Sequence, residues 1–500
     1  MPQRYKSIYF SDLPSDRKRS VNIGFGAEDW ALADRVTGLP SANLRSAIGV
    51  ASFEELRKQA ATAGLAINSF CIERLRSWSN AHPSNDDAAF RDPLQATFSG
   101  GRGEPLHDWF PYLEGFSSLF VEEVIRRYVP RAQSVLDPFA GLGTTPLTAM
   151  RMGMRAYYAD VNPLCRFLIG IKRNVLKMSA QERQGYSARL LVTATSLQKL
   201  LSKTNENQQL KDSYSTVFGK SVFFNTPQLS AVLKLRTLID KINKSDPVFG
   251  SLLTVAAVRA LVPGSRLIRR GDLRFKTEAE ARLRDREFCD EVVAALDMMA
   301  HDLLNVPSCD GSAIEVADNA IGIDQRLPEC VDAIITSPPY LNGTNYFRNA
   351  KLELWFSREL KDQRDLRRLR FEAITAGIND VTTGKTAARA SVFQDKRLQG
   401  IVRRLRRDSY DTRIGDMVAT YFADMWLALT SCTGRLAKHG IIALDIGDSR
   451  YGEIYVPTDA ILASALEALG LQKVDDVCLR QRASRGGFPL REALLIYSKV

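Results

Sequence analysis

The chain of 500 residues is 45% hydrophobic and 25% charged, a globular composition that excludes a disordered, collagen-like or coiled-coil chain. Its 68 Lys and Arg residues exceed its 57 Asp and Glu residues, and the resulting charge of +11 favours a polyanionic partner. The sequence shows no signal-peptide pattern and no long apolar run, so we expect a cytoplasmic protein without membrane association.

The seven cysteines are scattered, and neither they nor the four histidines have the spacing of zinc ligands. We therefore expect buried free thiols and no metal site. Residues 1–95 precede the first sheet signals and contain a possible helical pair between Phe53 and Trp78. No role follows from this pattern.

A strand, a tight loop and a helix are expected next. The apolar segment Ser134–Leu136 precedes Asp137-Pro-Phe-Ala-Gly-Leu-Gly-Thr-Thr145, and a helix with Thr145 as its N-cap continues to a stop at Gly153. A second strand, Met154–Ala159, ends on Asp160. This order predicts the opening of a doubly wound parallel sheet.

Residues 171–300 carry apolar side chains at helical spacing and predict a large, mainly helical insertion. Sheet signals then resume, and the expected elements are strands at Val331–Ile335 and Gly440–Ile446, a helix at Thr458–Leu469, and strands at Val474–Leu479 and Ala493–Tyr497. The predicted fold is therefore α/β, with a doubly wound Rossmann-like sheet.

We divide the chain into six parts on this basis. They are an N-terminal extension (1–95), a cofactor-binding part (96–170), the helical insertion (171–300), a catalytic part (301–349), a basic segment (350–419) and a C-terminal part of the sheet (420–500).

The glycine loop and the acid after the second strand together indicate a nucleoside-bearing cofactor. Gly141 and Gly143 have no Cβ and let backbone N–H groups approach a ligand, and Asp160 is placed to accept hydrogen bonds from ribose hydroxyls. A purely structural tight turn is the alternative. The loop lacks the Gly-Lys-Ser/Thr of a phosphate-binding loop and the third glycine of the dinucleotide fingerprint.

The glycine loop and Thr336-Ser-Pro-Pro-Tyr340 together resemble the S-adenosylmethionine-dependent DNA amino-methyltransferases. The segment Leu106–Ser117 is similar to the motif that precedes the loop in that family. The resemblance extends over about 100–170, 305–350 and 420–500. It implies a methyltransferase sheet and a cofactor site formed by Asp137, Phe139, Gly141, Gly143, Thr144, Asp160, Asp310, Phe116 and Ser117.

The catalytic residues that the resemblance implies are Ser337, Pro338, Pro339 and Tyr340. An aromatic exocyclic amine is a poor nucleophile because its lone pair is delocalised into the ring. The Ser337 hydroxyl and the Pro338 carbonyl are suited to accept the two amino hydrogens, while Tyr340 stacks on the base. A base in double-stranded DNA must be flipped out of the helix to reach such a site.

Basic residues are concentrated between Lys361 and Arg407, where 13 Lys and Arg residues face 5 Asp and Glu residues. We expect phosphate contacts there, with a solvated helix face as the alternative. A second cluster, Ser265–Lys276, either contacts DNA or connects helices. The candidate DNA-binding residues are Arg403, Arg404, Arg406, Arg407, Arg269 and Arg270.

The predicted function is methylation of cytosine N4 in DNA, in a bacterial restriction-modification or defence system with a cognate endonuclease as possible partner. Adenine N6 is the first alternative. RNA and protein-glutamine methyltransferases usually carry Asn where this chain has Ser337, which argues against both. A silent nucleic-acid-binding module is the remaining alternative. About 200 residues separate the two motifs, so the target-recognition region stays open between the insertion, 350–420 and the N-terminal region.

Overall fold

The structure is a computed structural model that describes residues 4–10, 19–25, 48, 53–63, 65–81, 96–112, 115–270, 272–283, 286–307, 309–341, 346–484 and 487–500. The chain divides into two compact units, Met1–Leu94 and Gln95–Val500. In the smaller unit β1 (Arg4–Phe10) pairs antiparallel with β2 (Arg19–Phe25). The expected helical pair is present as α3 (Phe53–Thr62) and α4 (Ile67–Ala81).

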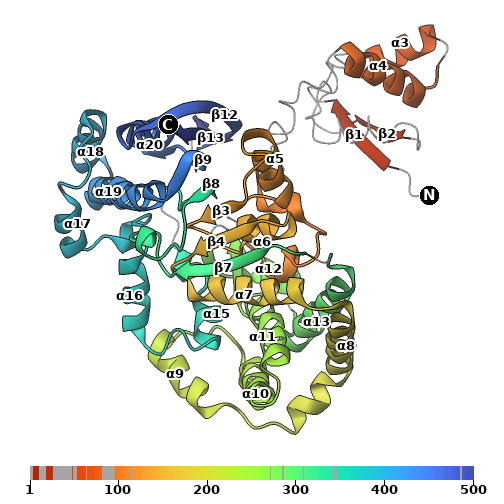
Figure 1. The fold of residues 1–500 in the computed structure, drawn as a ribbon. Helices are drawn as coiled ribbons and strands as arrows, with labels where there is room; N and C mark the ends of the chain where they lie inside the picture. The colour runs from red at the N-terminus through yellow and green to blue at the C-terminus, as the bar shows by residue number, and fades with distance from the viewer. Residues whose placement is uncertain are drawn as a thin grey trace. The chain divides into compact units, whose positions relative to one another are not determined.

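The larger unit is built around a seven-stranded sheet of order β12-β13-β9-β8-β3-β4-β7 (Figure 1). Its strands are β3 (Ser134–Asp137), β4 (Arg155–Ala159), β7 (Ser312–Ala317), β8 (Val331–Thr336), β9 (Leu436–Gly447), β12 (Leu471–Ala483) and β13 (Pro489–Lys499). The five strands from β7 to β9 are parallel, and β13 lies antiparallel between β9 and β12. The predicted doubly wound α/β fold is confirmed, since the parallel strands run 3-2-1-4-5 in chain order.

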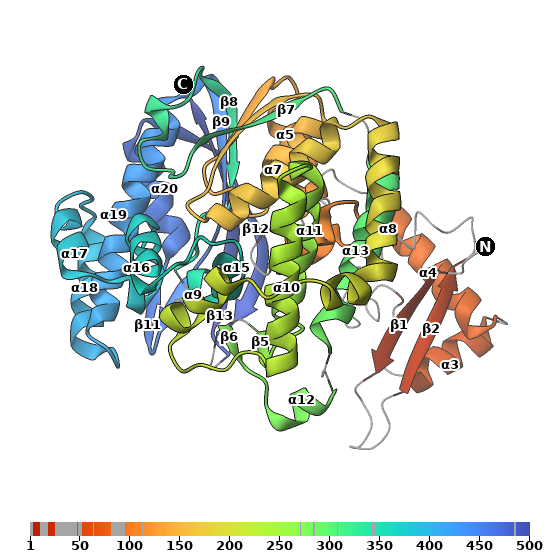
Figure 2. The same ribbon diagram turned by 90° about the horizontal axis from the view of Figure 1, so that it is seen from below.

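Helices cover both faces of this sheet (Figure 2). One group consists of α5 (Ser118–Tyr128), α6 (Thr144–Arg151) and α7 (Pro163–Lys177), and the other consists of α19 (Arg413–Gly434) and α20 (Thr458–Ala468). Thr145 was expected to cap α6, but Gly143 occupies the N-cap with φ +86°. Thr145 is instead buried inside the first turn of the helix.

The insertion between α7 and β7 is mainly helical. It consists of α8 (Ala180–Ser202), α9 (Gln208–Phe218), α10 (Thr226–Asn243), α11 (Pro247–Leu261), α12 (Glu278–Leu283), α13 (Phe288–Asn305), and the strands β5 (Leu267–Arg270) and β6 (Asp272–Phe275). The basic cluster Ser265–Lys276 contains the β5–β6 hairpin, which connects α11 to α12.

Short helices fill the segment between β8 and β9. They are α14 (Tyr346–Asn349), α15 (Lys351–Phe356), α16 (Gln363–Glu372), α17 (Thr383–Arg389) and α18 (Lys396–Asp408). The hairpin of β10 (Ser449–Tyr451) and β11 (Ile454–Val456) follows β9. In α18 the side chains of Leu398, Val402 and Leu405 are buried, because their spacing places them on one helix face.

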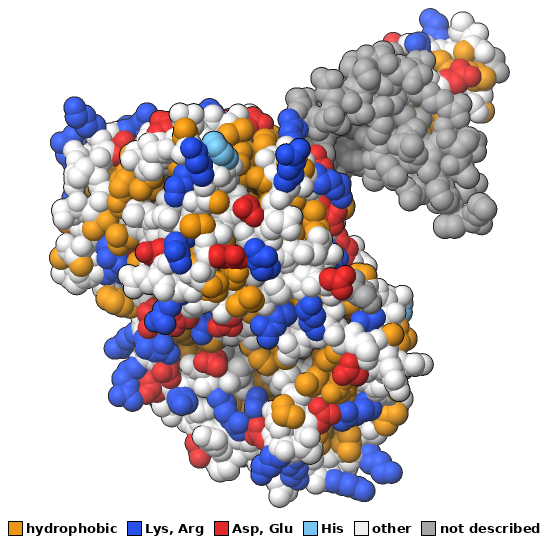
Figure 3. Space-filling view, in the orientation of Figure 1, with side chains coloured by type: hydrophobic (Ala, Val, Ile, Leu, Met, Phe, Trp, Pro, Cys, Tyr) orange, Lys and Arg blue, Asp and Glu red, His pale blue; other side chains and the backbone are white. Residues whose placement is uncertain are grey.

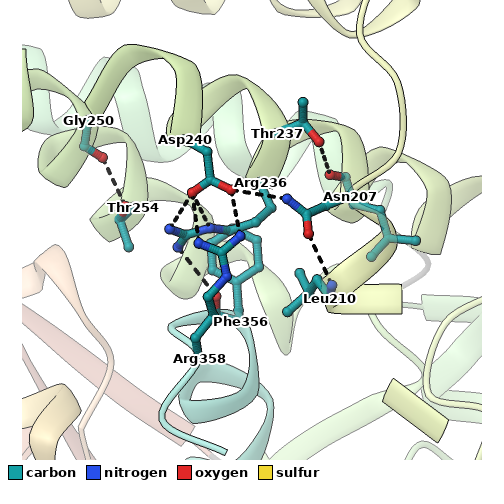
Figure 4. A network of polar contacts seen from close by, with 10 residues as sticks. Asn207, Leu210, Arg236, Thr237, Asp240, Gly250, Thr254, Phe356 and Arg358 are labelled. Carbon is teal, nitrogen blue, oxygen red and sulfur yellow. Dashed lines mark hydrogen bonds and ion pairs between the residues drawn. The ribbon is translucent and has the colours of Figure 1, made fainter. Parts of the chain in front are cut away.

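Two carboxylates fasten the insertion to the rest of the unit. Asp302 in α13 accepts hydrogen bonds from the Leu106 backbone and the Trp109 indole, both at 2.9 Å. Asp240 in α10 binds the guanidinium groups of Arg236 and Arg358 (Figure 4). The second contact crosses from the insertion to the residues that follow α15.

All seven cysteines are free thiols, but their predicted burial is only partly correct. Cys71, Cys165 and Cys432 are buried, whereas Cys330 and Cys478 are exposed. Cys330 lies in the turn before β8, and Cys478 lies on β12 at the edge of the sheet, where a side chain is less covered. Among the described residues, no helix has the length and apolar character needed to cross a membrane.

Replacing Asp240 with Asn should lower the free energy of unfolding by about 1–3 kcal/mol, because an amide leaves the two guanidinium groups short of acceptors. Denaturant unfolding monitored by circular dichroism measures this change. Asp212→Asn is the matched control, since Asp212 is exposed and accepts a hydrogen bond from Gln208 within the same helix. Equal losses in the two variants would contradict a fastening role for Asp240.

Candidate active site at the carboxyl edge of the sheet

The two sequence motifs meet at the carboxyl edge of the sheet. The glycine loop follows β3, and Ser337–Tyr340 follows β8, its direct neighbour. Thr336 Oγ1 donates a 2.7 Å hydrogen bond to Asp137 Oδ1, which also accepts the Phe139 N–H. Burial raises the pKa of Asp137 to about 7. Asp137 therefore joins the ends of β3 and β8.

The glycine loop has the backbone conformation that its glycines predict. Gly141 and Gly143 have φ angles of +52° and +86°, a region that side chains disfavour. The Gly141 N–H donates a 2.8 Å hydrogen bond to Oδ2 of Asp160, and the Asn162 N–H donates a 2.8 Å hydrogen bond to Oδ1 of the same carboxylate. Burial raises the pKa of Asp160 to about 6. Asp160 thus holds the loop, and each of its oxygens keeps a second lone pair for another donor.

Gly143 has a packing role that the sequence did not reveal. A Cβ atom built there lies 2.7 Å from Ile169 Cγ1 of α7, whereas one built at Gly141 lies 3.3 Å from Tyr112 Cε1. A side chain at position 143 would therefore have to displace the Ile169 side chain of α7.

The remaining predicted cofactor residues occupy different environments. Phe139 is half-buried against the core, and Thr144 is half-buried at the start of α6. Phe116 stacks on Phe120 with centroids 4.8 Å apart, and Ser117 caps α5 and is fully buried. The segment Leu106–Ser117 reaches the glycine loop through Tyr112, which the sequence prediction missed.

The assignment of Asp310 to the cofactor site was wrong. Asp310 precedes β7 and therefore lies at the amino edge of the sheet, because β7 runs parallel to β4. The acid that follows β7 is Asp318, which is exposed. β7 begins two residues after Asp310, and only the direction of this strand in the sheet shows which acid lies at the carboxyl edge.

The Ser-Pro-Pro-Tyr motif is hydrogen-bonded to the neighbouring strand β9. Pro338 is buried, while Ser337, Pro339 and Tyr340 are partly exposed. Tyr340 Oη donates a 2.8 Å hydrogen bond to Asp445 Oδ1, at the end of β9. The Ser337 side chain is hydrogen-bonded to Tyr340 as well. The prediction missed Asp445, although a lone acid inside the apolar run of β9 was the signal for it.

Some of the predicted DNA-binding residues form ion pairs within the protein, which limits their availability to DNA. Arg269 Nη2 lies 2.5 Å from Glu353 Oε1, whose side chain is 1% exposed, so assigning Arg269 to DNA was wrong. Arg270 is exposed and lies 3.6 Å from Glu280. The buried pair forms because Arg269 points from β5 toward α15.

The basic segment presents a mixture of paired and unpaired cations. Arg406 and Arg407 form 2.7 Å ion pairs with Asp416 and Asp408. Arg403 and Arg404 are exposed and form no ion pair with any residue that the structure describes. Figure 3 shows cationic side chains at the corner of the molecule that α18 forms in Figure 1.

Comparison with known proteins gives distant relatives of one kind. The chain is 22% identical over 488 residues to Type II methyltransferase M.BsoBI of Geobacillus stearothermophilus, covering 86% of this chain and 92% of that protein. It is 23% identical over 443 residues to Type II methyltransferase M.AvaI of Nostoc sp., covering 81% of this chain and 88% of that protein. The chain is therefore a distant relative of type II methyltransferases. No protein-family model matches it.

Among solved structures, the rRNA methyltransferase aviRa from Streptomyces viridochromogenes aligns with 82% of this chain and 96% of its own. The sequence identity is 12% and the TM-score is 0.29. This value is too low to establish a shared fold.

Replacing Gly143 with Ala should destabilise the protein more than replacing Gly153 with Ala. Both residues have φ above +80°, but a Cβ at Gly153 meets no atom within 4 Å. Gly153→Ala therefore carries the backbone cost of about 1–2 kcal/mol alone, and Gly143→Ala adds the clash with Ile169. Thermal unfolding of the two variants measures the difference, and equal melting temperatures would contradict the packing role.

Proposed function

We propose that this protein is an S-adenosylmethionine-dependent DNA methyltransferase that methylates the exocyclic N4 of cytosine in a restriction-modification system. The observation that carries the proposal is the Thr336–Asp137 hydrogen bond, which brings the glycine loop and Ser-Pro-Pro-Tyr together at one edge of the sheet. The similarity to two type II methyltransferases over more than 80% of the chain supports it. By that analogy, a cognate restriction endonuclease is the expected partner.

The residues around the glycine loop fit the cofactor. The topological switch point between β3 and β8, where ligands bind in open α/β sheets, lies beside this loop. Gly141 and Gly143 keep the backbone open to close approach, and Asp160 retains acceptor capacity suited to ribose hydroxyls. We add Asp318 in place of Asp310 as the acid after the third strand. The cofactor supplies an activated methyl group when bound.

The chain's own contribution is to hold the target amine in position. Ser337 is partly exposed beside the half-buried ring of Tyr340. The Ser337 hydroxyl and the Pro338 carbonyl would accept the amino hydrogens, while the Tyr340 ring would support the flipped base. Such acceptors pull electron density toward the amine nitrogen, which helps it to attack. Ser at position 337 favours cytosine over adenine by resemblance.

DNA phosphates are proposed to contact α18. Arg403 and Arg404 are exposed there, while the buried Leu398, Val402 and Leu405 hold the opposite face of the helix on the core. The helix also packs near β11, which follows β9 and thus lies at the carboxyl edge. This places unpaired cations on the side of the fold that carries the proposed active site.

Purified protein should convert cytosine in DNA to N4-methylcytosine, detected by mass spectrometry of the nucleosides. Ser337→Ala should lower turnover by about 10- to 100-fold, because one acceptor of the amine is lost, and should leave cofactor affinity unchanged. N6-methyladenine as sole product would transfer the assignment to adenine. Methyl transfer only to RNA or protein would refute the DNA assignment.

Removing the Arg403 and Arg404 charges together should flatten the dependence of log affinity for DNA on log salt by up to about 1.8, or 0.9 for each phosphate contact. Fluorescence anisotropy at several salt concentrations measures the slope. The matched control is the pair Arg406→Ala and Arg407→Ala, whose guanidinium groups already bind Asp416 and Asp408. An equal change in both double variants would contradict a specific role for Arg403 and Arg404.

A further inference from the structure

Three side chains form a hydrogen-bonded series beneath the proposed base site. Tyr340 Oη donates to Asp445 Oδ1 at 2.8 Å, and the Ser337 side chain is hydrogen-bonded to Tyr340. The series leads from the residue proposed to accept an amino hydrogen to the end of β9. The direction of these hydrogen bonds determines whether Ser337 donates a hydrogen bond to the base or accepts one from it.

The direction depends on the last member of the series. Each hydroxyl has one hydrogen, and a carboxylate can only accept. When Asp445 is ionised, Tyr340 directs its hydrogen to Asp445, and its oxygen accepts the hydrogen of Ser337. The Ser337 oxygen then has only lone pairs left for the base. An exocyclic amino group is a donor, so this is the arrangement that methyl transfer requires.

The acidic end of this series is buried. Asp445 is 2% exposed, and Glu492 on β13 is 1% exposed. Gly447 pairs with Glu492 and Asp445 pairs with Leu494, so the two acids share one face of the sheet on neighbouring strands. Water therefore has little access to the acidic end of the series.

Two arginines of β12 complete the group of charges around Asp445. Arg480 and Arg482 lie 2.9 Å and 3.0 Å from the carboxylate oxygens of Glu492. The Arg482 guanidinium lies 5.4 Å from the centre of the Tyr340 ring. Gly447 leaves the space that both side chains use, since a Cβ there would lie 3.2 Å from the ring and 2.1 Å from the guanidinium. One side of the Tyr340 ring is thereby occupied.

We propose that Asp445 is a positioning residue that acts through Tyr340 and makes Ser337 an acceptor toward the target amine. This inference rests on the proposed function and extends it to a residue outside the Ser-Pro-Pro-Tyr motif. Asp445 does not touch the base itself.

The proposed role of Asp445 predicts how the methylation rate depends on pH. Burial, and then the negative charge of Glu492, raise the pKa of Asp445 to about 8. Below that pH the protonated acid can donate to Tyr340, so the direction of the series is no longer imposed. Methylation should therefore become faster as the pH rises through about 8, because the acid loses its proton there.

The test compares the pH dependence of kcat for the wild type, Asp445→Asn, Tyr340→Phe and the double variant. Asn does not titrate and Phe breaks the series, so both single variants should lose the rise near pH 8. Each should lower kcat about three- to tenfold above that pH, with the KM for the cofactor unchanged. Asp445→Asn should have no further effect in the Tyr340→Phe background.

The matched control is Asp448→Asn. Asp448 is also buried at this edge and accepts the hydroxyl hydrogen of Tyr455, but not that of Tyr340. This variant should keep the rise near pH 8. A rise that persists in Asp445→Asn, or equal effects of that change with and without the Tyr340 hydroxyl, would overturn the inference and leave the proposed function intact. A wild type that methylates no DNA would overturn both.

Discussion

The carboxyl group of Asp137 accepts hydrogen bonds from the Thr336 hydroxyl and the Phe139 N–H at the ends of two neighbouring strands. Burying a carboxyl group is costly, and the raised pKa of Asp137 reflects that cost. The hydrogen bonds offset it, and they join chain segments 199 residues apart. The glycine loop and the Ser-Pro-Pro-Tyr motif share one edge of the sheet through this contact and the parallel pairing of β3 with β8. Every chemical role considered for the two motifs depends on that proximity.

The long insertion leaves this arrangement intact because it is fastened at defined points. Asp302 binds the segment before the glycine loop, and Asp240 binds Arg358 after α15 (Figure 4). One contact joins the insertion to the chain before the glycine loop, and the other joins it to the chain after the Ser-Pro-Pro-Tyr motif. The insertion is therefore fixed to the same unit that carries the proposed active site.

Charge has two different functions along this chain. Arg269 and Glu353 form a buried pair, and Lys385 and Arg389 both bind the fully buried Asp424. These cations hold helices together and are unavailable to phosphates. Arg403 and Arg404 lie on the solvent face of α18, opposite its apolar side chains. The number of Lys and Arg residues in the sequence therefore exceeds the number of cations that are available to bind phosphates. Only the ion-pair partners of each side chain show which of the two functions it has.

The sequence by itself predicted the strands β3, β4, β8, β9, β12 and β13, the glycine loop and the position of Ser-Pro-Pro-Tyr after a buried strand, but it did not predict β7. Those features follow from local rules: apolar periodicity, positive φ at glycine, and the rigidity of consecutive prolines. The tertiary structure decided which acids and cations share a site. Asp310 lies at the amino edge, Gly143 packs on Ile169, Arg269 forms an ion pair with the buried Glu353, and Asp445 binds Tyr340. These facts depend on strand direction and on contacts between residues far apart in the chain, and no local pattern encodes either.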